Sequence, residues 1–254
     1  MVGPVTSDDL SARRANSFGA HAAAYAEHRP DYPAAAIRWS LEPLGGGAHR
    51  VVDLAAGTGK LTGGLVAEGH QVTAVEPDES MLSELVRRHG CVRALPGTAE
   101  RIPLPDGTVD AVLVGQAFHW FDKAKALTEI ARVLRPGGVL ACLWNTADTT
   151  VPWVAKLDEL GKSSASVPGT VEETVPEHEK FGPLEVREFP HAHRRTAESL
   201  VTMISTHSHT LVIPAQEREH LLAGLLTYLK NTPETANGEF DFPLTTEAAR
   251  LRRT

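Results

Sequence analysis

The chain has 254 residues, a formal net charge of -7 at pH 7 and 42% hydrophobic residues. That length is sufficient for one α/β domain with additions and a sizeable buried core. The acidic balance argues against a nucleic-acid substrate, because nucleic acid favours a basic face. No apolar run approaches membrane-spanning length and residues 1–14 lack an apolar signal core. We therefore expect a cytoplasmic protein without membrane contact.

Strand and helix patterns alternate along the chain as they do in βαβ units. The expected strands lie at residues 50–55, 71–76, 91–95, 109–115, 138–144 and 183–191, with a terminal strand in 240–250. The expected helices lie at residues 16–28, 37–44, 59–68, 79–89, 122–134, 152–161, 196–206 and 214–229. The only cysteines, Cys91 and Cys142, both fall in apolar strand-like runs, which predicts buried thiols without a disulfide framework.

Local signals mark where several of these elements begin and end. Asp78 is a candidate N-cap for the helix at 79–89, and Gly90 follows its last turn. Arg135-Pro136-Gly137-Gly138 is expected to end the helix at 122–134 and to turn the chain into the next strand. We divide the chain into an N-terminal helical segment (1–45), an α/β core (46–146) and a C-terminal part of the same domain (147–254).

The segment Val51–Thr62, VVDLAAGTGKLT, carries the clearest functional signal. A β-branched, apolar run ends in a turn of small residues, and helix formers follow. Such a turn lets backbone N–H groups approach a ligand closely. A second apolar run ends at Glu76, which is expected at the carboxyl end of the neighbouring strand. Ligands of open parallel sheets bind in the crevice outside those ends, and a carboxylate there can bind both hydroxyls of a ribose.

Two other glycine motifs can be tested by counting. A P-loop requires GxxxxGK followed by Ser or Thr, but Leu61 follows Gly59-Lys60, and Leu54 stands where the first glycine belongs. The dinucleotide fingerprint GxGxxG would place its third glycine at Thr62, one residue before Gly63. The P-loop is excluded, and a nicotinamide dinucleotide is disfavoured without being eliminated.

The remaining pattern resembles the class I S-adenosylmethionine-dependent methyltransferases. Their first motif is a hydrophobic strand, an Asp and a GxGxG turn, and this chain has Asp53, Ala55, Gly57 and Gly59 at those positions, with Ala55 replacing the first glycine. PGTAERIPLPDGTVDAVLVGQAFHWF is similar to the family's third and fourth strands, and EIARVLRPGGVLACLWN to its next helix, turn and strand. SFGAHAAAYAEHRPDYP resembles the segment that precedes the domain in relatives of the aconitate methyltransferase type. The resemblance covers residues 17–145.

The resemblance implies a doubly wound, mostly parallel, seven-stranded Rossmann-like sheet with helices on both faces, an N-terminal helical lid and C-terminal helical additions. Residues 1–45 would then form the lid, residues 46–146 the cofactor-binding core, and residues 147–254 the C-terminal part of the same domain with a substrate-covering insertion. It also implies S-adenosyl-L-methionine as cofactor and no metal. Asp53 and the turn at Ala55, Gly57 and Gly59 are expected at its methionine end. The other expected cofactor-binding residues are Glu76 and Pro77 at the ribose, Thr98 and Ala99 at the adenine, Gln116 at the sulfonium, and Tyr25 and Arg29 in the lid.

The acceptor side is less defined. His119 is the candidate for contacting the acceptor and for taking a proton, because imidazole titrates near neutral pH. His191/His193 and His207/His209 form two His-x-His pairs, which we interpret as solvated or pocket-lining rather than as metal ligands.

We expect methyl transfer to a small-molecule acceptor, at a carboxylate or hydroxyl oxygen. The alternatives are a non-catalytic S-adenosylmethionine-binding or regulatory protein and, with less support, an NAD-dependent oxidoreductase. The sequence leaves open the acceptor's identity, the choice among O-, N- and C-methylation, the use of a general base, and the oligomeric state.

Overall fold

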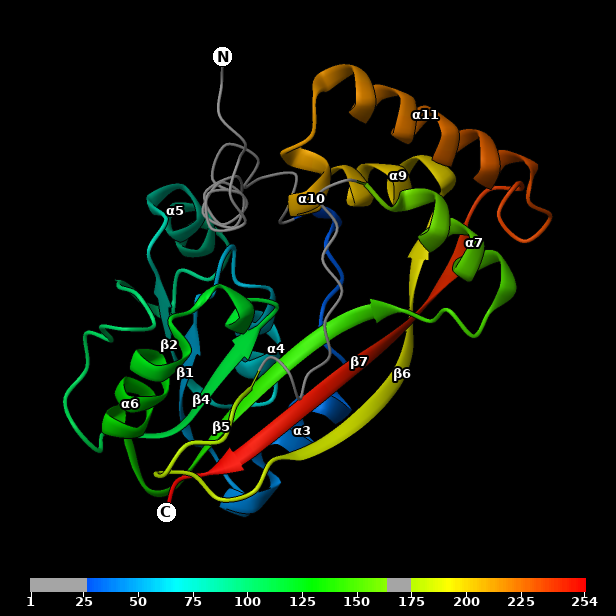
Figure 1. The fold of residues 1–254 in the computed structure, drawn as a ribbon. Coiled ribbons are helices and arrows are strands. Elements are labelled where there is room, and N and C mark those ends of the chain that lie inside the picture. Colours follow the sequence, from blue (N-terminus) through cyan, green and yellow to red (C-terminus); the bar gives the residue numbers. More distant parts are fainter. Residues whose placement is uncertain (1–26, 164–174) are drawn as a thin grey trace. The chain divides into compact units, whose positions relative to one another are not determined.

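A computed structural model describes residues 27–163 and 175–254 (Figure 1). The strands are β1 (Arg50–Leu54), β2 (Gln71–Glu76), β3 (Arg93–Pro96), β4 (Val109–Gly115), β5 (Leu134–Ala147), β6 (Glu185–Arg195) and β7 (Phe240–Arg252). The helices are α3 (Ala34–Leu41), α4 (Lys60–Ala67), α5 (Glu79–Arg88), α6 (Lys123–Val133), α7 (Pro152–Gly161), α9 (Ala197–Ser205), α10 (Ser208–Leu211) and α11 (Ala215–Asn231). Two short 3-10 helices, η2 (Glu42–Leu44) and η3 (Phe118–Trp120), complete the set of described elements.

The strands form one seven-stranded sheet in the order β3-β2-β1-β4-β5-β7-β6. The neighbours from β3 to β5 pair in parallel. β7 is antiparallel to β5 and β6 (Figure 1). Backbone hydrogen bonds at the two ends of β5 agree with this direction, because Gly137 pairs with Arg253 and Asp148 pairs with Pro243. The predicted doubly wound, mostly parallel sheet is confirmed. Its order reverses between β1 and β4, which is where such sheets open a ligand crevice.

Helices cover both faces of the parallel part of the sheet, so its strands are apolar on both sides. Ile37 of α3 and Leu65 of α4 pack with Val51 on one face. Leu127 and Ile130 of α6 pack with Val52 on the other. Alternate residues of β1 therefore enter different core layers, as the period of two requires.

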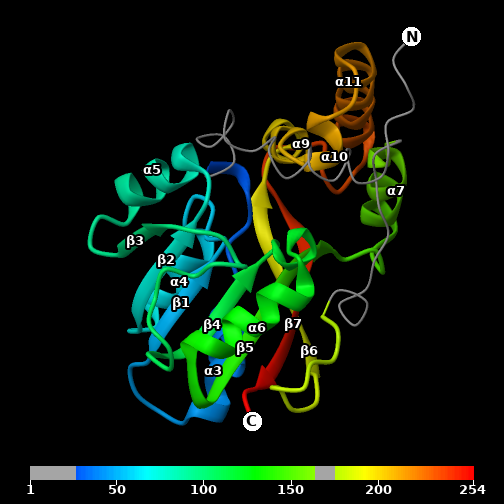
Figure 2. The same ribbon diagram turned by 60° about the vertical axis from the view of Figure 1, so that its left-hand side comes forward.

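The described residues fall into two compact units. One unit contains residues 30–146, 175–191 and 245–254, and therefore holds the parallel strands and the helices α3 to α6. The other contains residues 27–29, 147–163 and 192–244. Its core joins α7, α9 and α11 to the start of β7, and α9 lies beside α11 in both views (Figures 1 and 2).

Three expectations about local structure need correction or delimiting. The Pro136-Gly137-Gly138 segment does not lie before its strand: β5 already begins at Leu134, because Leu134 pairs with Val109 of β4 and the two glycines hydrogen-bond with Arg253 of the C-terminal segment. Cys91 is exposed, because β3 begins only at Arg93, whereas Cys142 is buried as expected. Most of the helix expected at 16–28 lies outside the described residues.

Among the described helices, none combines the length and apolar character needed to cross a membrane.

Candidate cofactor and methyl-transfer site

The turn between β1 and α4 is built from left-handed residues. Ala55, Gly57 and Gly59 have φ angles of 55°, 56° and 88°. The Ala56 amide donates to the Val75 carbonyl at 3.1 Å, which ties the turn to β2. Gly59 is the N-cap of α4. The three left-handed residues, at alternate positions, turn the chain sharply at the carboxyl end of β1, where the sequence predicted a ligand-binding turn.

Glu76 at the end of β2 holds this turn with its carboxylate. Oε2 accepts a hydrogen bond from the Gly57 amide at 2.8 Å, and Oε1 accepts one from the Asp78 amide at 2.9 Å. The side chain is buried, and burial raises the pKa of the carboxyl while the two hydrogen bonds oppose that rise. Pro77, the next residue, is exposed. Glu76 thus joins the ends of two adjacent strands.

Asp53 is buried beneath the turn. Its Oδ2 accepts a hydrogen bond from the Thr62 hydroxyl at 2.5 Å. Burial raises the pKa of Asp53 from 3.8 to about 7, against the lowering effect of Thr62. Asp53 Oδ1 and the buried Thr58 Oγ1 have no hydrogen-bond partner among the described residues. Buried polar atoms of this kind are rare, and a bound ligand is one way of satisfying them.

Thr98 and Ala99 follow β3 and have different environments. Ala99 is buried in the core, whereas Thr98 lines a cavity of about 550 Å³ together with Gly97 and Arg101. The Thr98 carbonyl accepts a hydrogen bond from the Arg101 amide at 3.2 Å. The two residues expected near the adenine are therefore adjacent in the chain, but only Thr98 borders this open space.

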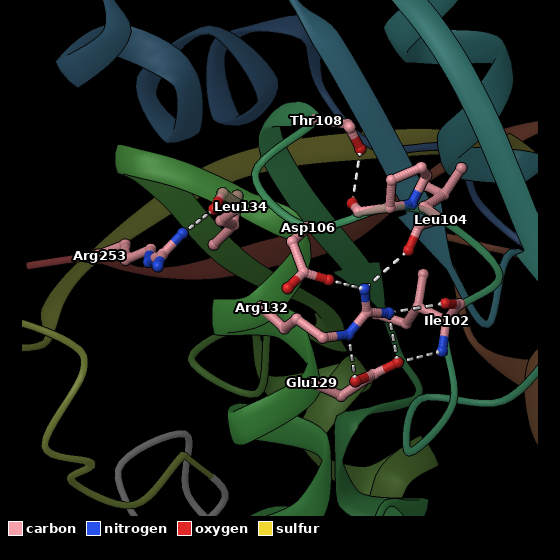
Figure 3. Close-up of polar contacts among 9 residues, drawn as sticks. Ile102, Leu104, Asp106, Thr108, Glu129, Arg132, Leu134 and Arg253 are labelled. Carbon is pink, nitrogen blue, oxygen red and sulfur yellow. Dashed lines mark hydrogen bonds and ion pairs between the residues drawn. The ribbon is translucent and has the colours of Figure 1, made fainter.

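Arg132 of α6 anchors the segment after Thr98 (Figure 3). Its guanidinium donates to the Leu104 and Ile102 carbonyls at 2.8 and 3.0 Å and pairs with Asp106 at 2.6 Å and Glu129 at 2.7 Å. Hydrogen bonds from Arg132 lower the pKa of Glu129, which also accepts the Ile102 amide at 2.8 Å. The network ties the backbone of the loop between β3 and β4 to α6.

Gln116 follows β4 in a left-handed conformation, with φ of 57°, and its Nε2 donates to the Asn145 carbonyl at 3.0 Å. A strained residue at a strand end is a feature of functional sites. Tyr32 lies against the preceding residue, Gly115. A Cβ at Gly115 would come within 2.5 Å of the Tyr32 hydroxyl oxygen, so glycine is what admits the ring there.

The segment after Gln116 contains both buried packing residues and an exposed histidine. Phe118 is fully buried and contacts Phe121 with ring centroids 5.4 Å apart. His119 is exposed, and its ring centroid lies 4.3 Å from that of Trp120. The phenylalanines of this segment therefore serve the core, while the imidazole is accessible.

The two residues expected in the lid are Tyr25 and Arg29. Tyr25 lies outside the described residues. Arg29 belongs to the unit containing α9, where its guanidinium donates to the Thr206 hydroxyl and carbonyl at 3.2 and 3.1 Å. Within the described part of the chain, no group of three or more His, Cys, Asp or Glu side chains is placed to hold a metal ion.

Sequence reasoning assigned no role to Asp31 or Asn145, which lie beside the predicted residues. Asp31 pairs through its carboxylate with Lys60 at 3.1 Å, and its carbonyl accepts from Asn145 Nδ2 at 3.2 Å. The segment before α3 is thereby tied to the start of α4 and to β5. Both residues stand in motifs that carried the family resemblance, so that resemblance was the available signal.

Comparison with known proteins identifies the class. Residues 52–142 match the methyltransferase domain family. An uncharacterized methyltransferase of Mycobacterium tuberculosis is 43% identical over 87% of this chain and 88% of its own length. An uncharacterized methyltransferase-like protein of Schizosaccharomyces pombe is 36% identical over 87% of this chain and 89% of its own.

A solved structure of a candidate type II methyltransferase from Anaeromyxobacter dehalogenans superposes with a TM-score of 0.67 at 27% identity, covering 89% of this chain and 97% of that one. The chain belongs to the class I S-adenosylmethionine-dependent methyltransferases. Its family uses S-adenosylmethionine as methyl donor, and the fold and turn described above are those of that class.

Proposed function

We propose that this enzyme binds S-adenosylmethionine at the Ala55–Gly59 turn and transfers its methyl group to an oxygen of a small-molecule acceptor, a hydroxyl or a carboxylate. The observation that carries the proposal is the pair of buried atoms, Asp53 Oδ1 and Thr58 Oγ1, that lack partners among the described residues beside this turn. The cofactor carries positive charge at its sulfur and amino group, and a buried carboxyl is a suitable neighbour for such charge.

Each cofactor-binding residue has a proposed role. Asp53, Ala55, Gly57 and Gly59 bind the methionine end. Tyr25 and Arg29 belong to the lid that the family resemblance implies, and Arg29 pairs with the methionine carboxylate when the lid closes over the cofactor. Glu76, followed by Pro77, binds the ribose with the carboxylate that already orders the turn. The adenine lies against Thr98 and the Ala99 amide, and Gln116 faces the sulfonium. His119 contacts the acceptor.

Methyl transfer requires mainly that the protein position the methyl donor and the acceptor. When bound, S-adenosylmethionine would supply a methyl group on a positively charged sulfur, and that sulfur would leave as an aligned acceptor oxygen bonds to the methyl carbon. The chain's residues hold the two reactants in that line and exclude water. A carboxylate acceptor is ionised at neutral pH and needs no base, whereas a neutral hydroxyl must lose its proton. The class of acceptor therefore decides whether a base is required.

Isothermal titration calorimetry with S-adenosylmethionine tests the cofactor site. We expect Glu76→Ala to weaken binding by at least about tenfold, because hydrogen bonds to a charged group contribute roughly 1.5–3 kcal/mol each. Glu188→Ala, an exposed acidic residue on β6, is the matched control and should bind as the native chain does. Circular dichroism on both variants separates loss of binding from loss of fold.

The outcomes of this titration are distinct. Unchanged affinity in a folded Glu76→Ala variant rejects the ribose assignment. Absence of S-adenosylmethionine binding by the native chain rejects the proposed function, and tight binding of a nicotinamide dinucleotide in its place would favour the oxidoreductase alternative. Binding without transfer of a labelled methyl group to any member of a broad panel of hydroxy and carboxylic acids would favour the non-catalytic alternative.

A further inference from the structure

A chain of side-chain hydrogen bonds crosses the sheet from Asn145 on β5 to His191 on β6. The Thr246 hydroxyl of β7 contacts Asn145 Oδ1 at 2.5 Å and His191 Nε2 at 3.0 Å. Asn145 Nδ2 donates to the Asp31 carbonyl at 3.2 Å. The Asn145 carbonyl also accepts from Gln116, the residue that follows β4. All five residues belong to the same compact unit. Gln116, at the start of this hydrogen-bond chain, is the residue proposed above to face the sulfonium.

The donor and acceptor in each of these hydrogen bonds follow from the Asp31 carbonyl at one end of the hydrogen-bond chain. The Asp31 carbonyl can only accept, so the Asn145 amide nitrogen must face it and the amide oxygen must face Thr246. A threonine hydroxyl has one proton, and that proton goes to the Asn145 oxygen. The remaining contact of Thr246 is then an acceptance, and His191 Nε2 must carry the proton that it donates. In the neutral imidazole, Nδ1 is left with its lone pair.

The surroundings of His191 favour the neutral imidazole. The ring is half-buried, and burial lowers the pKa of His191 below its ordinary value. No charged group contributes to that lowering. Among the described residues, Thr246 is the only hydrogen-bond partner of the ring. His191 therefore has a fixed tautomer with an unprotonated nitrogen that can receive a proton, whereas His119 has an exposed ring beside Trp120.

We propose that His191 is the general base of this methyltransferase and that the acceptor is a hydroxyl compound rather than a carboxylate, an inference that rests on the proposed function. The hydroxyl oxygen forms a bond to the methyl carbon with one lone pair, and the carbon–sulfur bond breaks with its electrons remaining on sulfur. The hydroxyl proton passes to His191 Nδ1, and the partly exposed imidazolium releases it to solvent. The products are the methyl ether and S-adenosylhomocysteine.

The same tautomer discriminates against carboxylates. An ionised carboxylate has only lone pairs, and it has no proton to donate to Nδ1. Placed beside that nitrogen, it would lose hydrogen bonds to water without gaining one from the protein. A hydroxyl acceptor donates to Nδ1 before reaction and loses its proton there during reaction. The hydrogen-bond chain thus favours an acceptor that can donate a proton to His191 Nδ1.

Nitrogen-15 NMR of the histidine rings tests the assignment on the full chain loaded with S-adenosylhomocysteine. We expect the His191 ring to show a protonated Nε2 and an unprotonated Nδ1 at pH 7.5, and Thr246→Val to lose this preference while Thr246→Ser keeps it. Titration with 4-methylphenol should shift the Nδ1 resonance, and 4-methylbenzoate, its carboxylate counterpart, should not. A protonated Nδ1, or no response to the phenol, overturns the proposal.

Methyl transfer to 4-methylphenol in single turnover gives the second readout. We expect His191→Gln to slow transfer on the order of a hundredfold, within the range of general-base effects, and to abolish the fall in rate at acid pH. His193→Gln, two residues along the same strand, is the control and should transfer at the native rate. Equal rates for the native chain and His191→Gln, or transfer only to the benzoate, overturn the inference.

Calorimetry distinguishes a failure of the proposed cofactor binding from a failure of the proposed role of His191. If the native chain fails to bind S-adenosylhomocysteine, the proposed function itself fails. If it binds, and His191→Gln binds within about twofold of it, any of the overturning results above removes the role of His191 and leaves cofactor binding intact.

Discussion

The Glu76 carboxylate accepts the Gly57 amide at 2.8 Å, so the acidic residue that ends β2 also shapes the turn that ends β1. Its second oxygen accepts the Asp78 amide at 2.9 Å, at the residue that caps α5. One buried side chain therefore links a glycine turn, a strand end and a helix start. Its role in the apo protein is structural before any ligand arrives.

Glu76→Gln should destabilise the protein by about 1–3 kcal/mol. An amide has one oxygen, so its nitrogen must face one of the two backbone N–H groups and leave a buried donor unsatisfied. Urea unfolding followed by circular dichroism measures the change. Glu188→Gln on exposed β6 should stay within about 0.5 kcal/mol of the native chain. Equal stability of the two variants would show that the Glu76 contacts contribute nothing net.

Asp53 should make the apo protein less stable as the pH rises. Its folded pKa of about 7 exceeds the ordinary 3.8, so the folded chain holds the proton more tightly than the unfolded chain. The associated stability is complete below about pH 3.8 and is lost as the pH rises through 7. Between pH 4 and 8 the free energy of unfolding of Asp53→Asn should therefore rise by a few kcal/mol relative to that of the native chain, at about 1.4 kcal/mol for each unit of pKa difference.

Urea titrations of both proteins across that pH range measure the difference. Parallel dependence of the two unfolding free energies on pH would contradict the raised pKa of Asp53. Addition of S-adenosylmethionine to the native chain should reduce the loss at high pH, because its positive charge stabilises the ionised carboxylate.

Ala55→Gly should stabilise the protein by roughly 0.5–1 kcal/mol. Ala55 has φ of 55°, where a Cβ costs about 1–2 kcal/mol, and the gain is reduced by the greater freedom of glycine in the unfolded chain. The adjacent Ala56→Gly is the control: Ala56 is buried without a positive φ, so this change should destabilise. Thermal unfolding of both variants decides, and a lowered Tm for Ala55→Gly would refute the strain argument.

Gly115→Ala should destabilise the protein by about 1–3 kcal/mol, because the new methyl group would lie 2.5 Å from the Tyr32 hydroxyl oxygen. Tyr32→Ala in the same chain removes the clash, and the double variant should lose less than the sum of the two single changes. Gly224→Ala in α11, where a Cβ meets nothing within 4 Å, should be neutral or stabilising. Additive losses in a double-mutant cycle would refute the contact.

The local patterns of the sequence predicted much of the fold. β2 and β4 have the expected bounds of 71–76 and 109–115, and Asp78 caps α5 by accepting the Ser80 and Met81 amides at 2.9 Å. These features depend on residues close together in the chain, so periodicity and capping chemistry are sufficient to indicate them. β5 was predicted too short because Leu134 pairs with Val109 of β4 and the Gly137-Gly138 backbone pairs with Arg253, and no local pattern shows these distant partners.

The sequence by itself determined the family, because the motifs that carry the resemblance follow one another in order over residues 17–145. It also determined the glycine turn and the position of Glu76 at the end of β2, because both depend on residues within two adjacent βα units. Only the tertiary structure decided which polar side chains meet at the far strands. Thr246 lies 101 residues from Asn145 and 55 from His191, and Asn145 lies 114 from Asp31. Strand order and register bring these residues together, and they assign the proton of His191 to Nε2, because hydrogen-bond direction depends on every partner being in place.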